Sequence, residues 1–107
     1  MKRSACLNAL IVAGALAGGA ARAGTANDVD QLSQYAAVLG AANACHLDTA
    51  AETDRVKRWV SFTFLGPGQF DLAMGLLSSE TAFHEREQLA HSAASCRTIE
   101  NALIALS

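Results

Sequence analysis

The sequence has very little of what builds β-sheets or separates domains. Pro67 is the only proline among 107 residues, and no repeat, low-complexity tract or linker-like composition interrupts the chain. The one run with strand character, WVSFTF at residues 59–64, is flanked on both sides by segments of helical periodicity. These absences exclude an all-β fold and leave room for one domain. The sequence therefore predicts an all-α fold, a small bundle of three or four helices.

The short motifs of common enzymes and metal sites are also absent. The chain has no G-x-S-x-G, no H-E-x-x-H and no C-x-x-C, so it also lacks the C-x-x-C-H that attaches haem. His46 follows Cys45, but a disulfide at Cys45 would leave no thiol to act as a nucleophile. We therefore expect no catalytic residue, no metal site and no cofactor.

The first residues have the composition of an export signal. Lys2 and Arg3 precede an apolar run at residues 7–16. Ala21-Arg22-Ala23 follows, which fits the A-x-A rule for signal peptidase. We therefore predict a secretory signal peptide over residues 1–23.

Cleavage there would leave a single small helical domain, residues 24–107, in the periplasm or outside the cell. An uncleaved anchor is the alternative, but the apolar run is shorter than a membrane-spanning helix and Arg22 follows it closely. We expect no stable membrane insertion after cleavage. Three of the eight basic residues lie in residues 1–23, so the remaining five face ten acidic residues and the formal charge is −5. An acidic domain is a poor partner for nucleic acid.

The cysteines predict a covalent link. Cys6 lies within the predicted signal peptide, which leaves Cys45 and Cys96. Because export leads to an oxidising compartment, an even pair predicts a disulfide. It would close a loop of about 52 residues and contribute ~4 kcal/mol to stability in the chain-entropy model. A redox-active or metal-binding pair is the alternative, which the long separation between the two cysteines disfavours.

Residues 28–45 have the periodicity of a first helix, which Thr25 or Asn27 can cap. Its last turns consist of alanine with Gly40, small enough for a second helix to approach closely. The next helix should begin near residues 48–49.

Thr49 and Glu52 of this second helix have the spacing of a capping box. Gly66-Pro67-Gly68 interrupts the pattern as a hinge or a plain turn. A short apolar helix near residues 70–77 should follow, then a cap or kink at SSET, then one long helix over residues 81–106. The expected core consists of Leu32, Leu39, Trp59, Val60, Met74, Leu89 and Leu103.

Glu80, His84, Glu87 and His91 share one face of the predicted last helix, opposite an apolar row that includes Leu89. We interpret this face as solvent-exposed. A partner surface, a pH-sensing surface and a metal site are the alternatives, but one helix face supplies fewer than the three or four ligands of a metal site.

A basic cluster lies in the most aromatic part of the chain. Arg55, Lys57 and Arg58 precede Trp59 and Phe62. Because Trp59 and Phe62 diverge in angle around a helix, we expect Phe62 to be exposed. Because Phe62 lies close to the three cations in the sequence, we predict a partner contact formed by Arg55, Lys57, Arg58 and Phe62. An ordinary solvated helix side is the alternative.

The segment YAAVLGAANACHLD (residues 35–48), followed by the late Cys96, resembles small secreted two-cysteine proteins of α-proteobacteria. The resemblance implies export and a disulfide, and it transfers no catalytic residue. The general plan, a small acidic helical domain with one disulfide, also looks like that of periplasmic acid-stress chaperones.

These observations predict an exported, non-enzymatic binding or accessory protein with a protein partner. The second hypothesis is a periplasmic stress chaperone that exposes apolar helices when it is acidified. An enzyme or a metal-binding protein is the third, and an enzyme would need a polar pocket that the sequence does not reveal.

Overall fold

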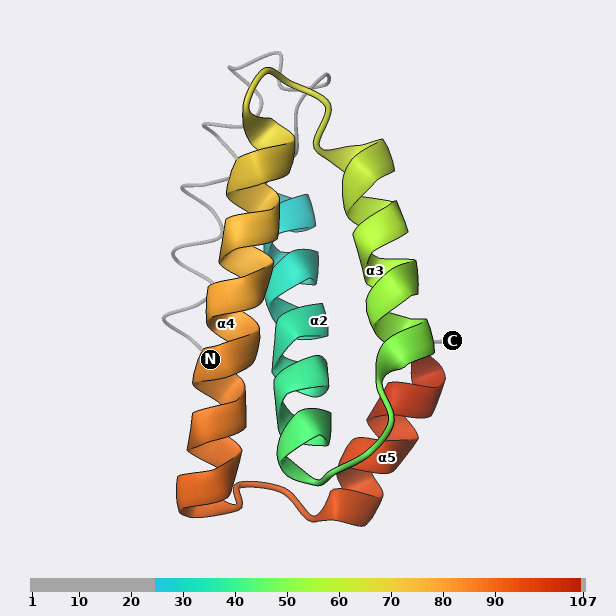
Figure 1. Ribbon diagram of the computed structural model, residues 1–107, viewed down its shortest axis with the longest axis vertical. Coiled ribbons are helices and arrows are strands. Elements are labelled where there is room, and N and C mark those ends of the chain that lie inside the picture. Colours follow the sequence, from blue (N-terminus) through green and yellow to red (C-terminus); the bar gives the residue numbers. More distant parts are fainter. Residues whose placement is uncertain (1–24, 107) are drawn as a thin grey trace.

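The computed structural model describes residues 25–106, which form four helices and, within that range, no strand (Figure 1). The helices are α2 (Ala26–Ala44), α3 (Ala50–Thr63), α4 (Gln69–His91) and α5 (Cys96–Ala105). The predicted all-α fold is confirmed. The predicted signal peptide, residues 1–23, lies outside the described residues.

Helix α2 is the centre of the bundle and contacts the other three helices. Helices α2 and α4 run parallel and side by side, α3 runs in the opposite direction, and α5 crosses the end at which α2 and α4 finish (Figure 1). The core is built almost entirely from aliphatic side chains of all four helices: Leu32, Ala36, Leu39, Ala42, Val56, Val60, Phe64, Ala73, Leu77, Ile99 and Leu103.

The predicted close approach at Gly40 is confirmed. A Cβ atom placed on Gly40 would lie 2.9 Å from the backbone N of Glu85 and 2.9 Å from the Cβ of His84. It would lie closer still to the carbonyl oxygen of Thr81. The two backbones therefore touch where α2 crosses α4, and this contact fixes the register between the helices.

Of the two predicted capping residues, Thr25 caps the first helix, which begins at Ala26, two residues before the predicted start. The Thr25 hydroxyl accepts a hydrogen bond from the Asp28 N–H at 3.2 Å, and the Asp28 carboxylate accepts one from the Thr25 N–H at 3.0 Å. This reciprocal pair is a capping box and satisfies two donors at the N-terminus of α2.

The predicted role of Thr49 as the capping side chain of α3 is wrong. Thr49 occupies the N-cap position, but its side chain makes no capping hydrogen bond. Its hydroxyl instead donates to Asn43 Oδ1 at 3.0 Å, and the Ala50 N–H donates to Asp48 Oδ1 at 3.1 Å. Thr49 has φ −112° and ψ 11°, outside the extended conformation that a capping residue normally adopts.

The predicted long helix over residues 81–106 is also wrong, because residues 92–95 are not helical and separate α4 from α5. The predicted short helix near residues 70–77 and the predicted cap or kink at SSET are wrong as well, because α4 runs without interruption through SSET and ends at His91. Ser92, which follows, adopts a left-handed conformation with φ 48°. Ser95 then caps α5 by accepting a hydrogen bond from the Thr98 N–H at 3.1 Å. The buried Gln88 side chain fixes the turn, since its Nε2 donates to the Ala94 carbonyl at 2.8 Å.

This break overturns the expected faces of α4. Leu89, predicted to be in the core, is 63% exposed, whereas Glu80 and His84, predicted to face solvent, are half-buried. Glu87 and His91 are exposed as predicted, and they approach to 3.8 Å. The expectation fails because Cys96 and Leu103, which continue the apolar row of Leu89 in the sequence, belong to a different helix.

The other predicted core residues divide into two groups. Leu32, Leu39, Val60 and Leu103 are buried, while Trp59 and Met74 are half-buried. The Trp59 ring packs edge to face against Tyr35 and Phe64, with ring centroids 5.1 and 5.7 Å apart. Trp59 therefore closes the side of the core rather than filling its centre.

The predicted disulfide between Cys45 and Cys96 is present in the structure, with Cα atoms 5.8 Å apart. Cys45 ends α2 and Cys96 begins α5. The bond therefore holds the short last helix against the end of the central one.

Candidate functional site

Large apolar side chains are exposed around the turn between α3 and α4. Phe62 is 77% exposed, Leu72 is 73% exposed and Leu65 is 66% exposed, and Phe70 and Val29 are exposed to a smaller degree. All five lie where α2 begins, α3 ends and α4 begins, which is one end of the bundle in Figure 1. We call Val29, Phe62, Leu65, Phe70 and Leu72 the apolar end.

Part of the apolar end surrounds a hollow of about 170 Å³. Val29 and Leu72 lie at its edge, and the buried side chains of Leu32, Phe64 and Ala73 form part of its lining. An exposed apolar side chain beside an apolar hollow gives a surface that can take up a protruding side chain of another protein.

The predicted partner contact, Arg55, Lys57, Arg58 and Phe62, is divided among different faces of α3. Arg58 lies one turn before Phe62 and approaches Asp54 at 4.0 Å, where both charges are exposed. Arg55 lines a small cavity with Tyr35 and Trp59. Lys57 lines the opposite side of α3, toward α4. Only Arg58 and Phe62 therefore share a row.

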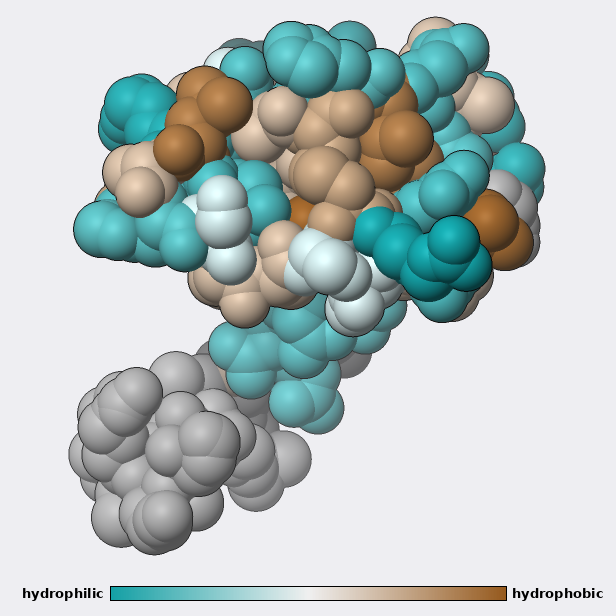
Figure 2. All heavy atoms as spheres, turned by 90° about the horizontal axis from the view of Figure 1, so that it is seen from below, coloured by the Kyte–Doolittle hydropathy of each residue, from teal (hydrophilic) through white to brown (hydrophobic). Residues whose placement is uncertain are grey.

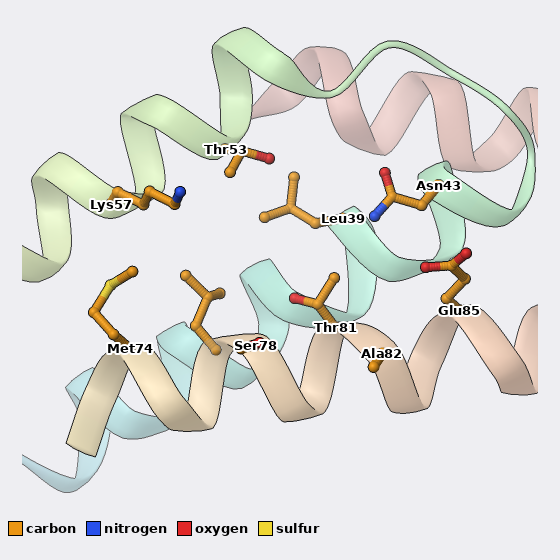
Figure 3. A pocket seen from close by; sticks show the side chains of 10 residues that line it. Leu39, Asn43, Thr53, Lys57, Met74, Ser78, Thr81, Ala82 and Glu85 are labelled. Carbon is orange, nitrogen blue, oxygen red and sulfur yellow. The ribbon is translucent and has the colours of Figure 1, made fainter. Parts of the chain in front are cut away.

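A groove of about 360 Å³ lies between α3 and α4, with α2 as its floor. Figure 3 shows Lys57 and Thr53 on the α3 side, and Met74, Ser78, Thr81 and Glu85 along α4. Leu39 and Leu77 form the apolar base, and Asn43 lies near Glu85 at one end of the groove.

Two charged side chains of opposite sign line the groove. Lys57 stands on one wall and Glu85 on the other. Neither side chain forms an ion pair with any group in residues 25–106. The amide of Asn43 is oriented by Thr49, which donates to Asn43 Oδ1 at 3.0 Å and so leaves Nδ2 for a second interaction.

Sequence reasoning missed the groove and most of the apolar end. The groove takes residues from three helices, and only Lys57 among them was predicted as a site residue. Leu72 lies within the short apolar helix that the sequence predicts near residues 70–77. A signal was available in the GPG turn, since apolar residues on both sides of a tight turn lie near the end of the bundle, where few neighbours can cover them.

The opposite end of the molecule has a mixed surface. Seen from that side, apolar residues form a band that hydrophilic residues border (Figure 2). Within residues 25–106, no three His, Cys, Asp or Glu side chains come close enough to share a metal ion. None of the helices in this range combines the length and the apolar composition that crossing a membrane requires.

Comparisons of the chain with protein-family models, with curated proteins and with solved structures give no match.

Proposed function

We propose that this protein is an exported, non-enzymatic accessory protein that binds an apolar segment of a partner protein through its apolar end. The observation that carries the proposal is the exposure of Phe62, Leu65 and Leu72 at one end of a helical bundle. A small protein gains nothing in stability from three such side chains in water, and exposed apolar clusters mark interaction sites. The aromatic ring of Phe62 is the type of anchor that dominates binding energy in protein interfaces.

Export to the periplasm or the exterior is part of the same proposal. Its support is the basic and apolar pattern of residues 1–23 together with the disulfide between Cys45 and Cys96, a bond that persists in oxidising compartments. The disulfide joins the end of α2 to the start of α5, away from the apolar end, and so does not cover the proposed binding surface.

A stress chaperone is the second candidate. It is favoured by the exposure of apolar side chains outside the apolar end, namely Phe83, Leu89 and Ile104. Such scattered sites suit many weak contacts with unfolded clients, whereas the grouped side chains of the apolar end suit one partner.

The proposal predicts the result of a matched affinity purification from native cells. Because the anchors would be removed, the double variant Phe62→Ser and Leu72→Ser should recover at least tenfold less of the partner than the wild type. The matched control, Leu89→Ser with Ile104→Ser, removes side chains of similar exposure elsewhere and should recover as much as the wild type. Quantitative mass spectrometry gives the readout. Recovery of the same partner in the same amount by the wild type and by both double variants would overturn the proposed surface.

A further inference from the structure

We propose that the groove between α3 and α4 binds a short apolar peptide with free termini, its carboxylate at Lys57 and its ammonium at Glu85. The site is separate from the apolar end, because the two share no lining residue. The groove volume of about 360 Å³ lies at the lower end of the range for small-molecule sites. This volume accommodates a small ligand and is too small to enclose a protein segment with its own secondary structure.

The charges of the groove specify a ligand that carries both signs. Lys57 and Glu85 line one groove but stand on different helices, and neither forms an ion pair within residues 25–106. An anionic ligand would attract Lys57 but would be repelled by Glu85. A cationic ligand would attract Glu85 but would be repelled by Lys57. A zwitterion satisfies both charges.

The separation of the charges sets the length of the ligand. Lys57 faces the part of α4 between Met74 and Ser78, while Glu85 lies at the other end (Figure 3). Glu85 lies seven residues after Ser78 and eleven after Met74. These separations correspond to ~10–16 Å along α4 at 1.5 Å per residue. An extended chain covers about 3.3–3.6 Å per residue, so three or four residues span this distance.

The walls between the charges suit a peptide backbone. A bound peptide needs partners for its N–H and C=O groups, and the groove offers the hydroxyls of Thr53, Ser78 and Thr81. Asn43 Nδ2 adds a donor, because the Thr49 hydroxyl donates to Asn43 Oδ1 and so orients the amide. At the base, Leu39 and Leu77 give an apolar seat for one side chain.

The probe for this site is the tripeptide Ala-Leu-Ala, measured with the full chain by NMR titration and calorimetry. Lys57→Met should raise the Kd of the free tripeptide about threefold to fivefold, the size expected for a partly exposed charge contact. The same substitution should leave the Kd of the C-terminal amide unchanged. Glu85→Gln should act in the same way on the free tripeptide and should not affect its N-acetyl form.

Two variants serve as matched controls. Arg58→Met removes a neighbouring cation that faces away from the groove, and Glu87→Gln removes a nearby carboxylate that is paired with His91. Both should leave the Kd of the tripeptide unchanged, and all four variants should keep the wild-type Tm. Absence of binding, or equal effects of Lys57→Met on the free and amidated peptides, would overturn the proposal. Free leucine binding as tightly as the tripeptide would overturn the assignment to a peptide.

Discussion

Replacement of both Cys45 and Cys96 by serine should lower the free energy of unfolding by about 4 kcal/mol. The disulfide closes a loop with a sequence separation of 51 residues, and in the chain-entropy model the bond acts by restricting the unfolded chain. Small domains have a net stability of about 5–15 kcal/mol, so the variant should unfold at a much lower urea concentration. Equilibrium urea denaturation followed by circular dichroism measures the change.

Reduction of the wild type supplies the control for this prediction. The reduced wild type and the double serine variant should unfold at nearly the same urea concentration, because both lack the same cross-link. Hydrogen exchange should then be fastest in α5, which the bond holds against the end of α2. A wild type whose midpoint does not respond to reductant would show that the bond is absent or contributes nothing.

Gly40→Ala should lower the free energy of unfolding by about 2 kcal/mol, although alanine is the better helix former by about 1 kcal/mol. The added methyl group would meet backbone atoms of Thr81 and Glu85, which cannot move without shifting α4 as a whole. The substitution must therefore push apart the two helices that form the centre of the bundle. Thermal and urea denaturation measure the loss.

Gly75→Ala is the matched control on the partner helix. Gly75 lies in the second turn of α4 and is exposed, and a Cβ placed on it would meet no atom within 4 Å beyond its chain neighbours and the nearby backbone of its own helix. This substitution should therefore stabilise the protein by about 0.5–1 kcal/mol through helix propensity alone. Stabilisation of similar size by both substitutions would contradict the close crossing at Gly40.

The local features of the fold could be predicted from the sequence because short-range chemistry determines them. The Thr25 cap, the break at Gly66-Pro67-Gly68 and the small residues around Gly40 each depend on a few neighbouring residues. The disulfide could be predicted because Cys6 lies within the predicted signal peptide, which leaves an even pair of cysteines in an exported chain. The end of α4 could not, since residues 92–95 contain neither proline nor glycine and their conformation depends on the tertiary contact of Gln88 with Ala94.

The disulfide and the predicted helix over residues 81–106 are incompatible once the register of α2 and α4 is known. Gly40 lies level with Thr81, and both helices run in the same direction. Cys45 is then about 7.5 Å further along α2, while a continuous helix would carry Cys96 about 22 Å further along α4. The chain must turn back before Cys96 for the Cα atoms to reach 5.8 Å. The sequence does not specify this register, so its periodicity alone predicts one continuous helix with Leu89 in the core.

The candidate sites were predictable only in part for the same reason. The exposure of Phe62 followed from its angle on one helix, and the structure agrees. The location of Phe62, Leu65 and Leu72 at one end of the bundle, and the position of Lys57 and Glu85 on opposite walls of one groove, depend on how separate helices are placed. No local sequence pattern indicates how the helices are placed relative to one another.

Photo-crosslinking in native cells tests the proposed partner surface most directly. A photoreactive amino acid is placed at Leu65 in the apolar end and, as a control, at Ile104, which has a similar exposed fraction of 61% against 66%. We predict one discrete adduct of defined mass from position 65 and none from position 104. A ladder of many adducts from both positions that grows on acidification would support the chaperone instead, and no adduct from position 65 would contradict the proposed function.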